Sequence, residues 1–186
     1  MTRARSALAG LGLLALAFGV AFSTPGTAQV EAPFAVSGDV GERVVSQHLV
    51  VTTHAMTLAH EVVVDTWVGT TSGVWLVVDA TAEARTERST LGTAVFIDGV
   101  EYGSTTRTSS DTLDGRVVDA GFPITGSVLV ELPADILDRP GARSATVRFS
   151  TDGDVRLDSV IEMEVDLTAL DVENRAERDV PRAGAR

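Results

Sequence analysis

The chain has 186 residues, of which 44% are hydrophobic, and this composition favours a folded core over a disordered chain. With 15 Lys+Arg against 26 Asp+Glu, the formal net charge of −11 argues against binding to nucleic acid or to anionic lipid headgroups. The absence of cysteine excludes disulfides, thiolate catalysis, zinc–thiolate sites and a lipid-modified cysteine.

The N-terminal segment has the features of an export signal. Arg3 and Arg5 precede an apolar run at residues 7–22, and small residues with Pro25 follow it. The run is shorter than the roughly 20 residues that span a bilayer comfortably. We predict a signal peptide over residues 1–28. The alternative is an uncleaved anchor helix that tethers the domain to the membrane through residues 7–22. In both cases the folded part is exported, as a secreted protein or on the extracytoplasmic face of the cell membrane.

The next part of the chain predicts strands and one loop. Residues 30–36 contain Pro33, which cannot donate to a sheet ladder, so they predict a lead-in or edge strand. Residues 44–57 are β-branched and alternating, and residues 58–68 continue that character. Residues 69–73, with the sequence GTTSG, predict a loop.

Residues 73–84 predict the strand on which the domain is centred. All even positions from Val74 to Ala84 are apolar, whereas the odd positions begin with Trp75 and Val77 and become polar from Asp79. A period of two over this length indicates a long strand with one fully buried face. We expect its neighbours in the sandwich to pack on both sides of it.

The second half of the domain predicts further short strands. Asp98 and Gly99 lie between β-prone runs and predict a tight hairpin. A polar stretch at residues 103–115 predicts an exposed loop, and residues 133–137 one helical turn. Strands are predicted at residues 116–122, 127–132, 145–150 and 161–167.

The charged residues 171–186 predict a flexible tail. The domain division is therefore 1–28 for the export segment, 29–170 for the folded domain and 171–186 for the tail. About seven to nine short strands without intervening helices predict an all-β, immunoglobulin-like antiparallel β-sandwich. We expect the domain to be monomeric.

Five features in this order carry a family resemblance. They are Gly41, the strand at 49–57, the sequence GVWLVVDAT at 73–81, the hairpin FIDGVEY at 96–102 and the strand GSVLVELP at 126–133. Together they resemble the telokin-like, immunoglobulin-type domains of uncharacterised exported proteins of Gram-positive bacteria, actinobacteria in particular. The resemblance implies a β-sandwich and a surface or secreted location, and it transfers no activity and no functional residue.

No metal site is predicted. His48, His54 and His60 are six residues apart, and six residues of extended strand span roughly 20 Å, which is too far for ligands of one ion. Asp152, Asp154 and Asp158 surround Gly153 in an acidic turn that lacks the pattern of a calcium-binding loop. We interpret this turn as one whose aspartates bond to their own backbone.

No catalytic or cofactor-binding residue is predicted either. The GTTSG stretch differs from the G-x-S-x-G pattern of a serine nucleophile and precedes a strand, whereas that nucleophile follows one. A pair of carboxylates, as in glycosidases, leaves no mark in the sequence, so a small secreted hydrolase stays an alternative. Trp67, Thr70 and Thr71 are instead candidate contacts for a partner, because tryptophan is enriched at binding hot spots.

The sequence as a whole predicts a non-catalytic, extracytoplasmic binding or structural module. We expect it to act through contacts with a protein or a cell-envelope component. One alternative is an accessory subunit held beside a membrane complex by the uncleaved N-terminal helix. The other is the small carboxylate-based hydrolase.

Overall fold

The computed structural model describes residues 12–14, 16, 18, 31–108, 111–151 and 155–184. They belong to two units, Met1–Ala32 and Pro33–Arg186. In the first unit, residues 12–14, 16 and 18 are helical, and most of the predicted signal peptide lies outside the described residues. Within the described parts of the chain, no helix is long and apolar enough to cross a membrane.

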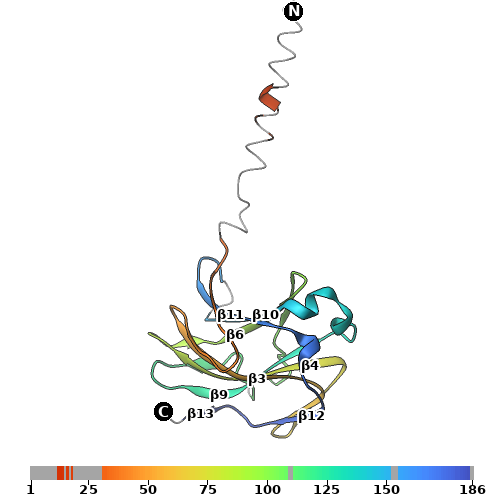
Figure 1. Cartoon of the computed structure of the whole chain (residues 1–186). Coiled ribbons are helices and arrows are strands. Elements are labelled where there is room, and N and C mark those ends of the chain that lie inside the picture. Colours follow the sequence, from red (N-terminus) through yellow and green to blue (C-terminus); the bar gives the residue numbers. More distant parts are fainter. Residues whose placement is uncertain are drawn as a thin grey trace, which may run out of the picture. The chain divides into compact units, whose positions relative to one another are not determined.

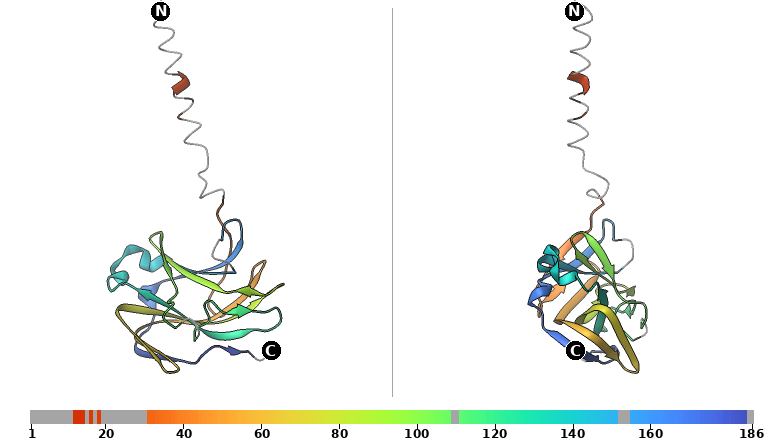
Figure 2. Two further views of the ribbon diagram at one scale, coloured as in Figure 1. Left: turned by 180° about the vertical axis from the view of Figure 1, so that it is seen from behind. Right: turned by 90° about the vertical axis from the view of Figure 1, so that its right-hand side faces the viewer.

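The second unit is a β-sandwich, with one sheet stacked on the other (Figures 1 and 2). Sheet A has the strand order β1 (Phe34–Ser37), β11 (Ser159–Val165), β10 (Ala145–Ser150), β6 (Gly92–Ile97) and β7 (Val100–Gly103). Sheet B has the order β12 (Val172–Arg178), β3 (Leu49–Val64), β4 (Trp67–Ala84), β9 (Ile124–Leu132) and β13 (Arg182–Ala183), and β2 (Arg43–Val45) also pairs with β3.

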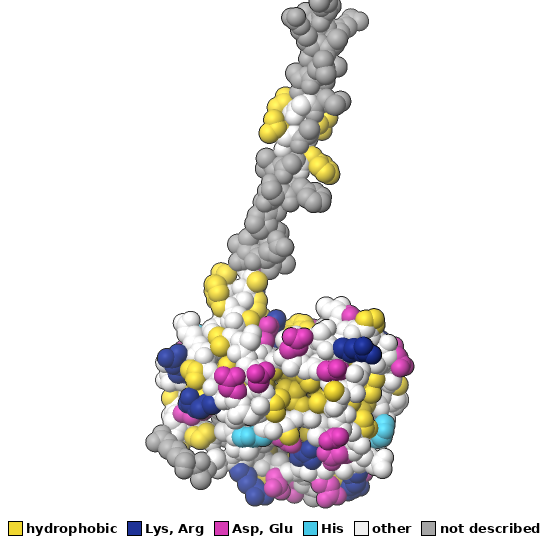
Figure 3. Space-filling model, viewed as in Figure 1, with side chains coloured by type: hydrophobic (Ala, Val, Ile, Leu, Met, Phe, Trp, Pro, Cys, Tyr) yellow, Lys and Arg dark blue, Asp and Glu magenta, His cyan; other side chains and the backbone are white. Residues whose placement is uncertain are grey.

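Short elements complete this unit. A small third sheet consists of β5 (Ser89–Thr90) and β8 (Val117–Val118). Three 3₁₀ turns cover Ile136–Asp138, Pro140–Ser144 and Leu167–Ala169, and the first of them overlaps the helical turn predicted at 133–137. On the face shown in Figure 3, acidic and basic side chains are interspersed with hydrophobic ones.

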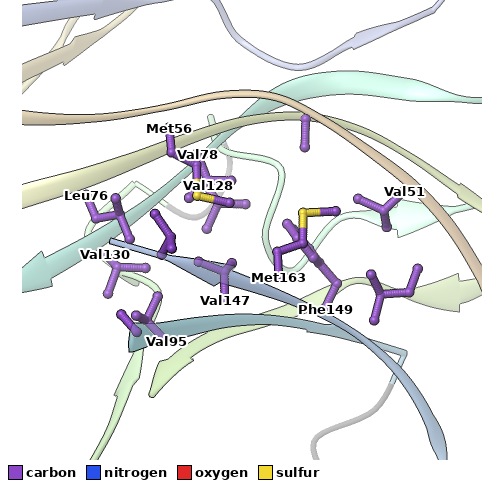
Figure 4. Packing of buried hydrophobic residues seen from close by; sticks show 14 of the residues in the cluster. Val51, Met56, Leu76, Val78, Val95, Val128, Val130, Val147, Phe149 and Met163 are labelled. Atoms are coloured by element: carbon purple, nitrogen blue, oxygen red, sulfur yellow. The ribbon is translucent and has the colours of Figure 1, made fainter. Parts of the chain in front are cut away.

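The central strand is confirmed. β4 lies between β3 and β9 in the middle of sheet B, and its even residues from Val74 to Ala84 belong to the main core between the sheets. Figure 4 shows Leu76 and Val78 of β4 among side chains from both sheets, including Phe149 of β10 and Met163 of β11. The core thus joins the apolar face of sheet B to that of sheet A, as alternation in the strands requires.

The odd residues of β4 build a second, smaller core. Trp75 and Val77 are fully buried with Leu129 of β9 and Ala176 of β12, and Trp67 and Val180 pack against this cluster. Trp75 therefore does not contribute to the core between the two sheets. It lies on the opposite face of sheet B, where the C-terminal residues cover it.

The predicted hairpin at Asp98 and Gly99 is confirmed. Ile97 of β6 pairs with Val100 of β7, and the two turn residues have φ angles of 51° and 75°. Positive φ at both central residues is the requirement of a type I′ turn, which glycine meets at no steric cost.

The prediction of a flexible tail at residues 171–186 is wrong for most of these residues. Val172–Arg178 forms β12 beside β3, and Arg182–Ala183 forms β13 beside β9. We call residues 172–183 the C-terminal strap, because they pass from one edge of sheet B to the other on the side away from sheet A (Figures 1 and 2). The strap is ordered because backbone groups at both sheet edges need partners, a demand that its own sequence does not reveal.

The prediction of a purely antiparallel sandwich of seven to nine strands is also wrong, both in the number of strands and in the direction of two of them. Over the described residues the unit has thirteen strands, and two edge strands pair in parallel, β1 with β11 and β12 with β3. Both are short segments at the ends of the domain that settle on an available edge. Sequence alternation reports which face of a strand is buried but not the direction of its neighbour.

Two predicted loops differ as well. Residues 69–73 lie inside β4, but Trp75 pairs with Ala59 while Thr70 pairs with Glu61, so residues 71–74 face the single residue His60. The loop signal thus corresponds to a large bulge within one strand, with four residues opposite one. Within the stretch predicted as an exposed loop at 103–115, Thr108, Thr112 and Leu113 are buried.

Candidate functional site

Trp67 is the centre of a surface that includes all three predicted contact residues. Its ring meets the ring of Trp75 edge-on, with centroids 6.0 Å apart and an interplanar angle of 80°. Trp67 is half-buried, Thr70 is exposed and Thr71 is half-buried beside the bulge of β4. The structure therefore brings the three residues together at one end of sheet B.

Two further residues complete this surface, which we call the Trp67 patch (Trp67, Thr70, Thr71, Arg107 and Glu131). The Arg107 guanidinium lies 5.8 Å from the ring centroids of both Trp67 and Trp75 and donates to the Thr70 carbonyl oxygen at 3.3 Å. It also pairs with Glu131 at 3.5 Å, and Glu131 accepts the Thr71 hydroxyl at 2.6 Å. The side chains of Arg107 and Glu131 are 48% and 42% exposed, so the patch is accessible as well as ordered.

Sequence reasoning missed Arg107 and Glu131. Arg107 comes from the connection after β7, and the backbone N–H of its neighbour Thr105 donates to the carbonyl oxygen of Leu129 on β9. This contact joins residues far apart in the chain, so no local pattern marks Arg107. Glu131 is an outward residue of β9, and the alternation of that strand was its only signal.

A second surface is a groove on sheet A with a volume of about 970 Å³, which we call the sheet A groove. Small residues line it: Ala94 of β6 pairs with Gly103 of β7, and Gly92 pairs with Ser150 of β10. Since large side chains are missing at these four neighbouring positions, the sheet surface is hollow there.

The walls of the groove carry charges of both signs, but its arginines are already paired. Arg148 bonds to Glu162 at 2.7 Å and lies 4.2 Å from the ring centroid of Phe96, and Arg88 bonds to Asp119 at 2.7 Å. Four carboxylates line the groove, from Glu87, Glu101, Asp114 and Asp158. The electrostatic potential inside it is therefore negative.

One end of the groove contains a partly buried carboxyl group. β7 leaves sheet A after Gly103, and the Asp114 carboxyl comes close to Thr93 on the β6 edge beyond that point. Burial raises the pKa of Asp114, while the hydrogen bond from the Ser104 hydroxyl and the proximity of Thr93 act in the opposite direction. Neither Asp114 Oδ1 nor Thr93 Oγ1 reaches a partner with hydrogen-bond geometry among the described residues.

The histidines and the acidic turn lie at separate places. His48 approaches Asp158 at 3.4 Å, His54 shares a hydrogen bond of 2.8 Å with Thr81, and His60 is exposed. Among the described residues, no three His, Asp or Glu side chains gather as metal ligands. Residues 152–154 of the acidic turn lie outside the described residues, and Asp158 accepts hydrogen bonds from the Ser159 N–H and the Thr151 hydroxyl.

The fold and these two surfaces define a β-sandwich with a preformed aromatic–charged patch and an open polar groove. No family model and no curated protein matches the sequence. An uncharacterized β-sandwich protein from Clostridium difficile is similar in structure, with a TM-score of 0.50 and 14% identity over 76% of this chain and 99% of that one. This likeness shows the β-sandwich fold.

Two other solved structures resemble the chain more weakly. A secreted protein from Mycobacterium tuberculosis, MPT63, has a TM-score of 0.47 and 17% identity over 70% of this chain and 98% of that one. The yjhA protein from Bacillus subtilis has a TM-score of 0.45 and 13% identity over 67% and 98% of the two chains.

Proposed function

We propose that the chain is a non-catalytic, extracytoplasmic binding module of immunoglobulin-like type that engages a protein or cell-envelope partner through the Trp67 patch. The observation that carries this proposal is the arrangement of Trp67, Arg107 and Glu131. Tryptophan and arginine are the residue types most enriched at binding hot spots. Here contacts within the domain already fix them, so a partner that binds them has less side-chain entropy to remove.

The state of Asp114 supports a non-catalytic role over hydrolysis. A raised pKa is a property of general acids, but Asp114 Oδ2 accepts the Ser104 hydroxyl and Oδ1 is buried. Asp158, another carboxylate of the groove, is engaged by the Ser159 N–H. A hydrolase would need one carboxyl free to protonate a leaving group and a second to act as base or nucleophile. Turnover of chromogenic glycosides or esters that Asp114→Asn abolishes would favour the hydrolase.

Site-specific photo-crosslinking in cells that export the chain tests the binding role. A photoreactive residue at the exposed Thr70 is expected to capture one discrete partner. The same residue at the exposed Thr86, outside the patch, is expected to capture none. Arg107→Ala should remove the Thr70 product while circular dichroism shows the same fold. Equal products from both positions, or none from Thr70, would contradict the proposal.

The export route is tested separately. Mass spectrometry of the exported protein is expected to find an N-terminus at Gln29, in agreement with a signal peptide over residues 1–28. An intact N-terminus that retains residues 7–22 would favour the accessory subunit tethered to a membrane complex. Neither result alters the test of the Trp67 patch.

A further inference from the structure

The Trp67 patch has polar atoms that the fold itself does not use. Both polar contacts of the Arg107 guanidinium, to the Thr70 carbonyl oxygen and to Glu131, involve the same nitrogen, Nη1. Within the described part of the chain, Nε and Nη2 of Arg107 and the hydroxyl of the exposed Thr70 make no hydrogen bond. Glu131 Oε1 accepts the Thr71 hydroxyl at 2.6 Å, whereas Oε2 lies 3.5 Å from Arg107. The patch therefore offers a ligand hydrogen-bond donors and an acceptor side by side.

The aromatic part of the patch lies next to these atoms. Trp67 is half-buried, and the Arg107 guanidinium is 5.8 Å from its ring centroid. In the stacked pair of Arg148 and Phe96 on sheet A, the corresponding distance is 4.2 Å. Arg107 thus lies beside the indole ring and does not cover it. A flat apolar surface therefore adjoins the free donors and the acceptor.

The two charges of the patch disfavour an ionic ligand. Arg107 and Glu131 lie 3.5 Å apart, so together they contribute no net charge. An anion bound to Arg107 would be repelled by Glu131 and by the net charge of −11 of the chain. A cation at Glu131 would be repelled by Arg107 in the same way. A neutral ligand with several hydroxyl groups meets neither repulsion.

Neighbouring hydroxyl groups fit this arrangement better than a peptide group does. A hydroxyl is both donor and acceptor, so two adjacent ones can accept from Arg107 and donate to Glu131. The N–H and C=O of a trans peptide group point in opposite directions, so one such group cannot bond to both side chains. A pyranose ring also has a flat face of C–H groups, which suits the surface of the indole ring.

We propose, building on the proposed function of the Trp67 patch, that its partner is a neutral saccharide of the cell envelope. The C–H face of one pyranose ring packs on the indole of Trp67. Two neighbouring hydroxyls of that ring accept from the free nitrogens of Arg107 and donate to Glu131 Oε2. The Thr70 hydroxyl is placed to bond to the next sugar unit.

Titrations of the exported protein followed by nuclear magnetic resonance test this inference. The neutral probes are cellotetraose and mannotetraose. Two charged probes keep the cellotetraose backbone, with carboxylates in place of its primary hydroxyls or amines in place of the hydroxyls next to the anomeric carbons. The neutral probes are expected to shift the indole N–H of Trp67 and the backbone N–H of Thr70, and to bind about tenfold tighter than the charged ones. A capped Gly-Ser-Gly-Ser peptide is the probe for a protein ligand.

Variants locate the binding. Arg107→Met keeps an unbranched side chain beside the two tryptophans but has no N–H donor, so it is expected to weaken the neutral probes about tenfold. Arg182→Met makes the same change in a 69% exposed side chain of the C-terminal strap and should leave affinity unchanged. The indole signals of both variants without saccharide show whether the small core around Trp75 is intact.

Four results would overturn the inference. They are the absence of shifts with both neutral probes at millimolar concentration, equal affinity for neutral and charged probes, undiminished affinity in Arg107→Met, and tighter binding of the peptide than of either neutral saccharide. If one of them occurs while a photoreactive residue at Thr70 still captures one partner, the binding role stands and the partner is a protein. If Thr70 captures nothing as well, the proposed function fails too.

Discussion

The indole ring of Trp67 occupies the space above Gly69, two residues along the same strand, where any other residue would place its Cβ. This close approach lets Trp67 turn its edge toward Trp75 and join the small core on the outer face of sheet B. Gly69 thereby sets the position of the Trp67 ring, which packs on the small core and also forms part of the surface. The two tryptophans are the only ones in the chain, so their fluorescence reports on this arrangement.

Gly69→Ala is expected to destabilise the domain by about 1–3 kcal/mol, because the added methyl group displaces the Trp67 ring from a packed site. Urea unfolding followed by tryptophan fluorescence measures the loss. Gly103→Ala is the control, since a Cβ there meets nothing within 4 Å. Equal midpoints for the two variants would show that the ring moves without cost.

Arg178→Ala is expected to lower the free energy of unfolding by about 2 kcal/mol. Arg178 Nε lies 3.0 Å from both carboxylate oxygens of Asp79, and the two side chains are only 19% and 25% exposed. The substitution leaves Asp79 with the Ser127 hydroxyl as its remaining side-chain donor.

Arg182→Ala is the matched control on the same strap. Its ion pair with Asp179 joins side chains that are 69% and 77% exposed, and such a pair contributes about 0–1 kcal/mol. Hydrogen exchange of β12 should therefore accelerate in Arg178→Ala and not in Arg182→Ala. The reverse order would show that the strap is held at its other end.

Removal of residues 171–186 is expected to destabilise the domain more than Arg178→Ala does. The truncation deletes Ala176 and Val180, which cover Trp75 and Val77. Exposure of that apolar face should shift the tryptophan emission to longer wavelength and increase the binding of a hydrophobic dye. A truncated domain with unchanged emission and stability would restore the flexible tail predicted from the sequence.

Asp114→Asn is expected to stabilise the domain at neutral pH and to have little effect in acid. Burial raises the pKa of Asp114 in the folded state, so folding is favoured below the ordinary aspartate pKa and this contribution is lost as pH rises through the raised value. Because asparagine carries no charge, the variant does not lose this stability as the pH rises. The melting temperatures of both proteins, measured from about pH 3 to pH 8, check this prediction. A difference in melting temperature that is the same at every pH would contradict it.

Much of the fold was predictable because the signals are local. The even apolar residues around Leu76 predicted the buried face of β4, and the pair Asp98 and Gly99 predicted a hairpin. Each depends only on neighbours in the chain. The candidate contacts Trp67, Thr70 and Thr71 were near each other in sequence, and their proximity in space needed no long-range information.

The rest depends on contacts between distant residues. Arg107 reaches the Trp67 ring only because the connection after β7 pairs with β9. The sheet A groove arises where Ala94 meets Gly103 across a register that neither residue specifies alone.

The amino-acid sequence alone identified the apolar faces of the strands, the position of the tight turn and the chemistries that the absence of cysteine and the acidic charge disfavour. These are properties of composition and of alternation along one strand. Contacts between distant segments established that Arg178 anchors the last strands to Asp79, that Trp75 faces away from sheet A, and that a hollow lies over β6 and β10. Free sheet edges, bulges and register are set between segments, so a charged segment is ordered only when a distant edge offers its backbone a partner.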